Sequence, residues 1–358
     1  MSLRVGLIGC GVISDIYLRN APLFPSFDIV CCADARPEAA STCAARYGIA
    51  SVSPEALIAD PNIDIVLNLT PPNAHAAVSL AALAAGKHVY SEKPLATLAE
   101  DARQIVALAQ QKGLAVASAP DTVLGPATRL ARSLIEDGSI GRPLLATAAV
   151  MGHGMEHWHP NPGFFYQKGG GPVFDVGPYY FASLTTLLGP VDQVSALTQI
   201  GNAQRVVTTP GSPVLGSTIV PDTPTTAAAL LRHENGVQAN VLLSWDVWRH
   251  GLPFIEIHGT EGSLRLPDPN WFGGSVLLSR RGEAWEELST EAQPFGKPNY
   301  QNRDLAVANY RGLGLETMAH DIITGAWNGA AATTALHLVE VMEAVLLAGA
   351  EERVIQLT

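Results

Sequence analysis

The stretch that decides the fold is LRVGLIGCGVIS, residues 3–14. Its first six residues form an apolar run typical of a buried parallel strand. The next six follow the pattern G-x-G-x-x-S and lead into IYLRNA, where a helix is expected. A strand, a glycine-rich turn and a helix in this order are the fingerprint of a dinucleotide-binding βαβ unit, in which the second glycine lets the backbone approach a pyrophosphate. The alternative is an ordinary strand–helix turn. We expect four loop residues to contact a dinucleotide: Gly9, Gly11, Val12 and Ile13.

Strands and helices alternate after this unit. We expect further strands at 27–33, 63–69, 88–91 and 114–118, with helices between them. Gly48 and Gly86 are natural helix ends, and Thr97 and Glu100 have the spacing of a capping box. The alternation predicts an α/β protein whose N-terminal part is a doubly wound, mostly parallel sheet.

Length and composition indicate two well-packed domains. A chain of 358 residues exceeds one typical core, and 47% of its residues are hydrophobic. We expect a Rossmann domain at residues 1–120 and a second α/β domain at 121–358. The formal charge of −11 leaves no basic cluster for nucleic acid or an anionic membrane. We also expect no segment as long as a membrane span.

The cysteines indicate a reducing compartment. All four lie within the first 43 residues and form no Cys-x-x-Cys pair. We interpret them as reduced, packed thiols of a cytoplasmic protein, with no metal bound. The apolar N-terminal run is interrupted by glycines and lacks a cleavage-type sequence, which argues against a signal peptide.

Asp34 and Arg36 bear on the choice of dinucleotide. Asp34 ends the second strand, where an acid accepts hydrogen bonds from the adenosine ribose and repels a 2′-phosphate. Arg36 has two possible roles, stacking on adenine or pairing with that phosphate. Together, Asp34 and Arg36 favour NAD and leave NADP possible. The alternatives are that Asp34 is only a turn residue and Arg36 only a solvated surface charge.

Two later strands end in polar loops, TPPNAH (residues 70–75) and SEKP (residues 91–94). In a parallel sheet, ligands bind at these carboxyl ends. We therefore expect contacts between the cofactor and Thr70, Pro71, Asn73, His75, Glu92 and Lys93. Asn73 also suits an N-cap of the following helix, and a packing role for His75 is equally open. The proline after Lys93 holds that lysine out of helical geometry.

Residues 121–358 have a different pattern, and all six tryptophans lie there. Apolar and alternating stretches such as PLLATAAV, VDQVSALTQI, TTAAALLRH, GVQANVLLSW and PFIEIHG predict a large open sheet, antiparallel or mixed. A sheet with one face uncovered would expose apolar surface. We therefore expect a homodimer or homotetramer.

The loop at residues 152–172, GHGMEHWHPNPGFFYQKGGGP, gathers three histidines in seven residues. A metal site is one interpretation and a plain surface loop is another. We favour a wall that lines a small-molecule substrate. The candidate substrate contacts are His153, His157, Trp158, His159 and, from SWDVW, Trp245, which suits the core equally well.

Taken together, these motifs resemble those of the Gfo/Idh/MocA oxidoreductases. The resemblance rests on Gly9-Cys10-Gly11, on Thr70-Pro71-Pro72-Asn73-x-His75, on Glu92-Lys93-Pro94, and on GGGPVFDVGPYY at 169–180. It implies an N-terminal Rossmann domain, a C-terminal α/β domain with a large open sheet, and NAD(P)-dependent oxidation or reduction of a carbinol in a sugar, polyol or related compound.

The resemblance also implies three catalytic residues. Lys93 would lie between nicotinamide and the substrate oxygen, with Tyr179 as acid/base and Asp175 as its motif partner. Many relatives have histidine where Tyr179 stands, and a free tyrosine ionises only near pH 10, so we expect Lys93 and the positive nicotinamide to favour the tyrosinate. If a helix opens at Asp175, positions 175 and 179 share a face. Two other functions stay open, an NAD-assisted glycoside hydrolase and a non-catalytic dinucleotide-binding regulator.

Overall fold

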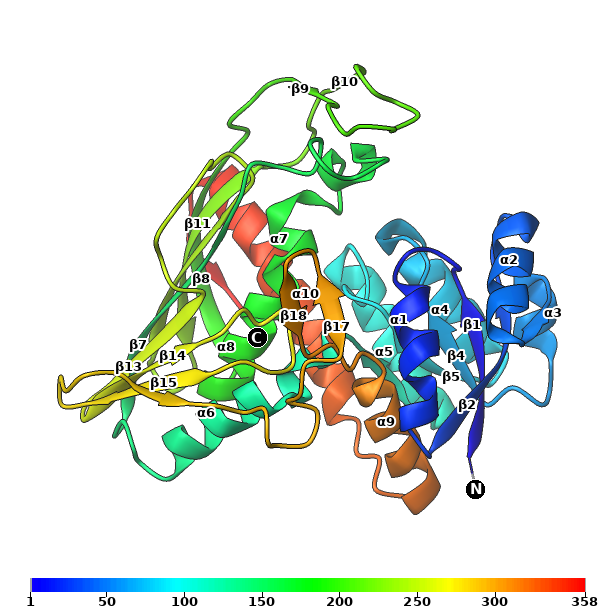
Figure 1. Ribbon diagram of the computed structural model, residues 1–358, viewed down its shortest axis with the longest axis horizontal. Coiled ribbons are helices and arrows are strands. Elements are labelled where there is room, and N and C mark those ends of the chain that lie inside the picture. Colours follow the sequence, from blue (N-terminus) through cyan, green and yellow to red (C-terminus); the bar gives the residue numbers. More distant parts are fainter. Residues whose placement is uncertain (1, 358) are drawn as a thin grey trace. The chain divides into compact units, whose positions relative to one another are not determined.

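The computed structural model describes residues 2–357, and the chain forms two compact units (Figure 1). The first comprises Met1–Leu124 and Asn309–Val339, and the second comprises Gly125–Ala308 and Glu340–Thr358. The long helix α10 (Ala330–Glu351) therefore contributes residues to both units. The grouping of 309–339 with the first unit depends on packing between distant segments, which a single boundary after residue 120 does not describe.

The first unit contains a six-stranded parallel sheet in the order β3-β2-β1-β4-β5-β6. β4 is wholly buried, and β1, β2 and β5 are buried toward their carboxyl ends, which explains the apolar residues there. Reversal of the strand order at β1 and β4 is the feature that positions ligands in doubly wound sheets. The strands are β1 (Leu3–Ile8), β2 (Phe27–Ala33), β3 (Ala50–Ser51), β4 (Ile65–Asn68), β5 (His88–Ser91) and β6 (Val116–Ser118).

Helices connect these strands and pack on the sheet. They are α1 (Ser14–Asn20), α2 (Pro37–Tyr47), α3 (Pro54–Ala59), α4 (His75–Ala84) and α5 (Ala99–Lys112), with short 3₁₀ turns η1 (Ala21–Leu23), η2 (Pro72–Ala74) and η3 (Asp121–Leu124). A later helix, α9 (Leu313–Thr324), packs against β6. The predicted helix end at Gly48 is confirmed, because Gly48 caps α2 at φ 68°.

The capping box predicted at Thr97 and Glu100 is wrong. The N-cap of α5 is Leu98, and no side chain caps that helix end. Glu100 instead accepts hydrogen bonds from Arg103 and Gln104 on the exposed surface of its own helix. A glutamate at this position can either take part in a capping box or pair with side chains three and four residues later in its helix. The spacing of residues in the sequence does not decide between the two.

The second unit contains a nine-stranded mixed sheet in the order β16-β15-β14-β13-β7-β12-β11-β8-β19. Only β7 and β12 pair in parallel within this sheet. Its strands are β7 (Pro143–Met151), β8 (Val191–Gln199), β11 (Thr226–His233), β12 (Gln238–Ser244), β13 (Ile255–Gly259), β14 (Gly262–Leu266), β15 (Val276–Arg280), β16 (Glu286–Leu288) and β19 (Ile355–Gln356). Two small hairpins lie outside it, β9 (Arg205–Val206) with β10 (Thr218–Ile219), and β17 (Tyr300–Asn302) with β18 (Leu305–Val307).

Three helices of this unit cover one face of the large sheet (Figure 1). They are α6 (Pro126–Glu136), α7 (Gly171–Asp175) and α8 (Gly177–Leu188), and the 3₁₀ turn η4 (Gly163–Tyr166) precedes α7. Burial alternates along β11, where Ala229 and Leu231 are buried and Leu230 is exposed. The sheet therefore has one covered face and one open face, as the sequence predicted.

Among the described residues, one helix is long and apolar enough to cross a membrane. It is α10, whose most apolar window has a mean hydropathy of 1.5 and is 44% buried within the protein. The expectation that no segment reaches this length is therefore wrong. A core helix of a globular protein meets the same criterion, so length and composition alone are weak evidence for a membrane span.

Candidate functional site

The glycine-rich loop follows β1 and is fixed at Gly9. Gly9 has φ 106°, and a Cβ atom there would lie 2.5 Å from the carbonyl carbon and oxygen of Leu69. At Gly11, by contrast, a Cβ atom would have no neighbour within 4 Å. Val12 is 90% exposed. The first glycine is thus required by the fold, whereas the second leaves open space above the backbone, which is what an approaching pyrophosphate needs.

Asp34 holds this loop to the end of β2. One carboxylate oxygen accepts a hydrogen bond from the Cys10 N–H at 2.8 Å, and the other accepts one from the Arg36 N–H at 2.8 Å. The Arg36 side chain is mostly exposed, with Nε 3.6 Å from the same carboxylate. Each carboxylate oxygen can accept a second hydrogen bond, so these contacts leave Asp34 with capacity for a ribose hydroxyl.

His75 links the loops that follow β4 and β5. Its Nε2 lies 2.7 Å from the carbonyl oxygen of Thr70, and its Nδ1 lies 2.6 Å from that of Pro94. Burial lowers the pKa of His75, while the two carbonyl groups oppose this shift. With both ring nitrogens against protein oxygens, His75 positions the two loops, and a direct contact with the cofactor stays a prediction.

The residues around His75 complete this loop. The buried Asn68 donates to the His75 carbonyl at 3.0 Å and accepts from the Thr70 hydroxyl at 2.7 Å. Pro71 and Asn73 are exposed. The suggested N-cap role of Asn73 is wrong, because Asn73 lies inside η2 and the N-cap of α4 is Ala74, with no side-chain cap.

Glu92 fixes the backbone of Lys93. Its side chain is buried, with Oε2 accepting from the Lys93 N–H at 2.9 Å and Oε1 accepting from the Tyr17 hydroxyl at 3.0 Å. Tyr17 belongs to α1, the helix that follows the glycine-rich loop. One buried carboxylate therefore ties the position of Lys93 to the element that carries the loop.

More buried polar groups lie in the first unit near Glu92. Asp121 accepts hydrogen bonds from the backbone N–H groups of Gly312 and Gly314 at 2.9 and 3.1 Å. Burial raises the pKa of Asp121 to about 6, although the Arg311 guanidinium lowers it. Burial also raises the pKa of Tyr17 well above its usual range. These long-range contacts had no signal in the sequence analysis.

In the second unit, Asp175 and Tyr179 stand on consecutive short helices. Asp175 is the last residue of α7, and Val176 separates it from α8, which contains Tyr179. The expectation that Asp175 opens a helix is therefore wrong, since Pro178 stands at the start of a new one. Tyr179 is buried. The catalytic roles of both residues stay predictions.

Buried charges hold the loop at 152–172 in place. Glu156 accepts hydrogen bonds from Arg205 Nη1 at 2.8 Å and from the Tyr166 hydroxyl. Arg205 also donates to Asp246, which accepts from two threonine hydroxyls as well. Arg205 and Glu156 are almost wholly buried. Removing one charge from such a group would leave the others buried and unpaired, so this network specifies the loop position.

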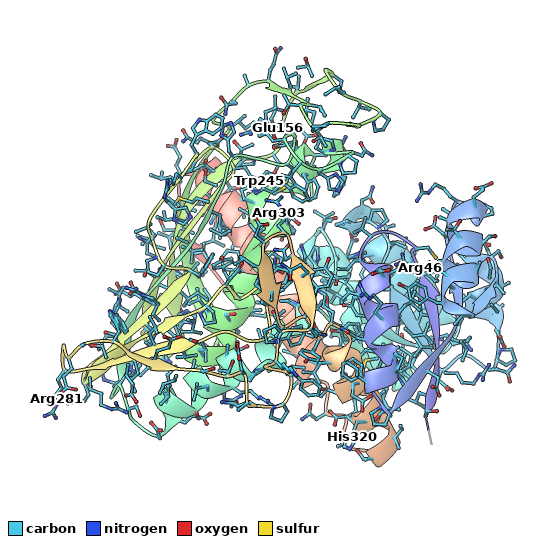
Figure 2. All side chains as sticks on the ribbon, in the orientation of Figure 1. Arg46, Glu156, Trp245, Arg281, Arg303 and His320 are labelled. Atoms are coloured by element: carbon cyan, nitrogen blue, oxygen red, sulfur yellow. The ribbon has the colours of Figure 1, made fainter. Side chains whose placement is uncertain are left out.

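Trp245 and Trp248 are close together in the sequence but have different surroundings in the structure. Trp245, labelled in Figure 2, is 2% exposed. It packs edge-on against Tyr166 at a centroid distance of 5.3 Å. This burial favours the core role that the sequence left open for Trp245, and its contact with substrate stays a prediction. Trp248 is 79% exposed, and its ring stacks on His153 at 3.2 Å between centroids. Trp248 was not among the residues predicted from the sequence, although its place in the same SWDVW motif was the available signal.

The three histidines of the loop at 152–172 differ in their contacts. His157 stacks on His153 at 4.9 Å, with its Nδ1 2.7 Å from the Thr208 hydroxyl. Burial and the neighbouring His157 lower the pKa of His153. His159 is close enough to Asp175 for that carboxylate to raise its pKa, although burial lowers the pKa overall. The half-exposed Trp158 lies under the Arg303 guanidinium. The structure thus brings four of the five predicted substrate residues into one loop surface.

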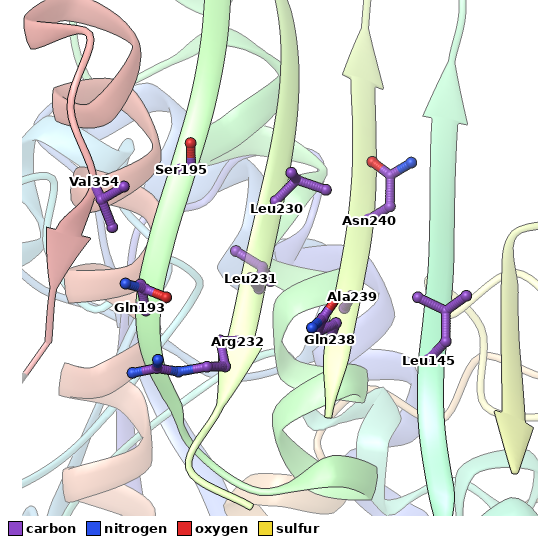
Figure 3. A pocket seen from close by; sticks show the side chains of 10 residues that line it. All are labelled: Leu145, Gln193, Ser195, Leu230, Leu231, Arg232, Gln238, Ala239, Asn240 and Val354. Atoms are coloured by element: carbon purple, nitrogen blue, oxygen red, sulfur yellow. The ribbon is translucent and has the colours of Figure 1, made fainter. Parts of the chain in front are cut away.

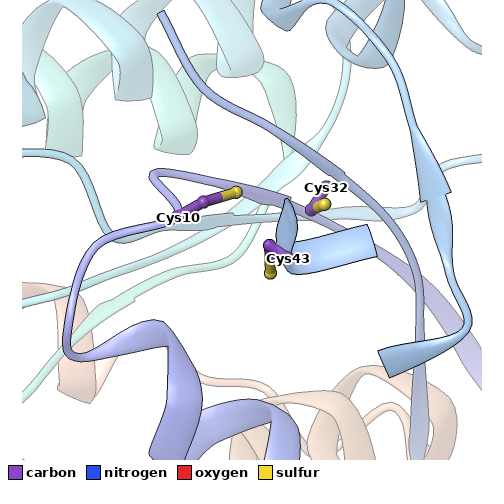
Figure 4. Close-up of side chains that lie close together, drawn as sticks. All are labelled: Cys10, Cys32 and Cys43. Carbon is purple, nitrogen blue, oxygen red and sulfur yellow. The ribbon is translucent and has the colours of Figure 1, made fainter. Parts of the chain in front are cut away.

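The histidine loop does not assemble a metal-binding group. Across residues 2–357, the one set of three or more ligand atoms close enough to share an ion comprises Cys10, Cys32 and Cys43. Figure 4 shows these three side chains.

A doubly wound sheet with this glycine-rich loop and acidic strand end defines a dinucleotide-binding fold. The oxidoreductase family with an NAD-binding Rossmann fold matches residues 3–119, and the GFO/IDH/MocA C-terminal domain matches residues 128–265. The chain belongs to the Gfo/Idh/MocA family. The predicted family, the fold class and the NAD-binding domain are confirmed.

Curated relatives agree with this assignment. The chain is 28% identical to levoglucosan dehydrogenase of Pseudarthrobacter phenanthrenivorans over 290 residues, which cover 74% of this chain and 73% of that protein. It is 30% identical over 272 residues to a dTDP-3,4-didehydro-2,6-dideoxy-alpha-D-glucose 3-reductase of Streptomyces violaceoruber, covering 74% and 72%. A solved structure of levoglucosan dehydrogenase in complex with NADH and levoglucosan superimposes with a TM-score of 0.82 over all of both chains, at 23% identity.

Proposed function

We propose that this chain is an NAD(P)-dependent dehydrogenase that moves a hydride between nicotinamide and a carbinol carbon of a sugar, polyol or related small molecule. In this proposal residues 1–120 bind the dinucleotide, and residues 121–358 serve substrate binding and oligomerisation, with 309–339 among them packing on the first unit. The observation that carries it is the geometry around Gly11, where a ligand can approach the loop backbone because a Cβ atom would have no neighbour within 4 Å. The preceding residues are fixed, Gly9 by its closeness to the Leu69 carbonyl group and Cys10 by the hydrogen bond from its N–H to Asp34. Asp34 favours NAD over NADP, since its carboxylate repels a 2′-phosphate.

Lys93 is the proposed contact to the substrate oxygen. Support comes from the buried Glu92, which fixes the Lys93 backbone through a hydrogen bond of 2.9 Å. The cofactor supplies the hydride chemistry when bound, and an ammonium group held at one place stabilises the negative charge that develops on the carbinol oxygen.

The test compares Lys93→Ala with Lys112→Ala, a surface lysine of the same unit that donates to the Ala84 carbonyl. We expect the first variant to lower kcat about a hundredfold or more with little change in NADH affinity, and the second to behave as wild type. Near-normal turnover by Lys93→Ala would refute the role.

Tyr179 is the proposed acid/base, with Asp175 as its motif partner. A hydroxyl that gives and takes the substrate proton should place a pKa on the pH–rate profile. We therefore expect Tyr179→Phe to remove one limb of the profile of kcat/KM. Tyr180→Phe is the matched control, because Tyr180 is the next residue of the same helix and is also buried. An unchanged profile in Tyr179→Phe would exclude the role.

The substrate class follows from the loop at 152–172. Relatives are named for levoglucosan, inositol and 1,5-anhydro-D-fructose. Histidine rings with an exposed tryptophan can donate hydrogen bonds and an aromatic face to such compounds. A panel of anhydrosugars, cyclitols and aldoses, offered with NAD and NADP and followed at the absorbance of reduced nicotinamide, would identify the substrate. Failure of every member to reduce either cofactor would count against the proposal.

The open face of the large sheet is the proposed contact between two copies of the chain. Figure 3 shows residues of this region, where Leu145 and Leu230 stand among polar side chains and the charged Arg232. Leu197 and Leu230 are 74% and 62% exposed on neighbouring strands. The charged residue that lines this face, Arg232, is already paired with Asp192 at 2.8 Å, so apolar and neutral polar groups are left to meet a second copy around a two-fold axis.

Light scattering after size-exclusion chromatography tests this interface. Leu230→Arg should shift the protein toward the monomer. Leu305→Arg, at an equally exposed leucine on a small hairpin, should not. A wild-type monomer, or equal effects of the two variants, would refute the interface. A cytoplasmic location is proposed on the four free cysteines.

A further inference from the structure

Three cysteines converge behind the glycine-rich loop (Figure 4). Cys10 comes from the loop itself, Cys32 from β2 and Cys43 from α2, and their sulfur atoms all lie within 4.8 Å of one another. Parallel pairing sets Cys32 opposite Leu7, just before the loop, and α2 packs back on β2. Cys31 precedes Cys32 on the strand, so its side chain points to the other face of the sheet and lies outside the cluster.

Two of the three thiols donate weak hydrogen bonds to backbone carbonyl groups. Cys10 Sγ donates to the Ala33 carbonyl at 3.5 Å, and Cys32 Sγ donates to the Ala40 carbonyl at 3.4 Å. A strongly thiophilic cation deprotonates the thiols that it binds.

The spacing of the sulfur atoms suits a single ion. Thiolates bound at about 2.3 Å around one trigonal ion lie about 4 Å apart. The observed upper limit of 4.8 Å therefore requires only a small inward movement. The set holds three sulfur atoms and, among the described residues, neither a ring nitrogen nor a carboxylate oxygen. Ligands of this kind select soft cations over Mg²⁺, Ca²⁺ and Mn²⁺.

We propose that Cys10, Cys32 and Cys43 form an all-thiolate site for one soft thiophilic cation, such as Zn²⁺ or Cd²⁺, and that filling this site opposes coenzyme binding. Three S–H bonds are lost and three metal–sulfur bonds form, while the three protons pass to the buffer and no electron is transferred. Sequence spacing gave no sign of this site, because the ligands come from three separate elements.

The link to coenzyme binding runs through Cys10 and rests on the proposed function. Cys10 is the middle residue of Gly9-Cys10-Gly11, and its N–H group donates to Asp34. Gly9 cannot move together with Cys10 when a cation binds, because Gly9 lies against the Leu69 carbonyl group. Drawing the Cys10 sulfur toward β2 and α2 therefore distorts the open loop at Gly11. By thermodynamic reciprocity, bound coenzyme lowers the affinity of the three cysteines for the cation by the same factor.

Cadmium alone is the probe for the site. Cd²⁺ is titrated into the reduced full-length protein and followed by the ultraviolet thiolate–cadmium charge-transfer band. We expect one Cd²⁺ per chain, bound at least about tenfold more weakly by Cys10→Ala, Cys32→Ala and Cys43→Ala than by wild type. Cys31→Ala is the matched control and should bind as wild type. Equal binding by Cys10→Ala and wild type, or equal losses in Cys31→Ala, would overturn the site.

Two further measurements protect the test against misfolding and against failure of the proposed function. X-ray absorption of the wild-type cadmium complex requires no variant, and fewer than three sulfur neighbours would overturn the proposal. One equivalent of Cd²⁺ should then lower NADH affinity about tenfold in wild type and leave it unchanged in Cys10→Ala. Cadmium bound by three sulfurs without an effect on NADH would overturn the coupling alone. Absence of NADH binding without cadmium would instead refute the proposed function.

Discussion

The two glycines of the loop provide the sharpest test of where the coenzyme binds. Gly11→Ala adds a methyl group with no protein atom within 4 Å, whereas Gly9→Ala adds one 2.5 Å from the Leu69 carbonyl group at φ 106°. The same substitution, two residues apart, should therefore affect ligand binding in one case and folding in the other.

The magnitudes follow from these surroundings. At Gly9, a left-handed alanine costs about 1–2 kcal/mol, and overpacking against backbone adds about 1–3 kcal/mol. Together these costs remove a large share of a typical folding free energy. At Gly11, alanine should leave stability within about 0.5 kcal/mol of wild type. Its methyl group should nevertheless weaken NADH binding by at least about tenfold, or 1.4 kcal/mol, because it occupies the space that a pyrophosphate needs.

The assay combines thermal unfolding with a fluorescence titration of NADH. We expect Gly11→Ala to unfold at the wild-type temperature and bind NADH weakly, and Gly9→Ala to unfold at a lower temperature. Wild-type NADH affinity in a folded Gly11→Ala protein would show that the coenzyme does not lie over this glycine, and the reasoning from open space would fail.

Two other predictions concern Asp121 and the tryptophans. Burial raises the Asp121 pKa to about 6 from 3.8, so the native state binds a proton more tightly than the unfolded state. As pH falls from 7 to 4, the unfolding free energy of wild type relative to that of Asp121→Asn should thus rise by up to about 3 kcal/mol. Urea unfolding measures this difference, and a difference that stays constant with pH would contradict the assigned pKa. Trp245→Ala should destabilise the second unit by about 3–5 kcal/mol, whereas Trp248→Ala should keep the melting temperature and raise KM. The reverse pattern would exclude Trp248 as a substrate contact.

Local sequence patterns predicted much of the fold. The apolar run before Gly9 gave β1, and the helix end at Gly48 appears at the predicted residue. Alternating burial along β11 leaves one sheet face open, as its sequence indicated. These features depend on hydrophobic periodicity and on backbone preferences within a few residues, which the sequence contains directly.

Other features depend on which distant side chains are buried together, and no short-range pattern encodes that. The sequence by itself determined the Rossmann unit, the glycine-rich loop and the candidate residues at the strand ends. Only the tertiary structure decided that Glu92 joins Lys93 to α1, that Arg205 holds the histidine loop, and that three cysteines meet behind Gly9. Buried charges and thiols are placed by partners from other elements, because each must find compensation for the water that it loses on folding.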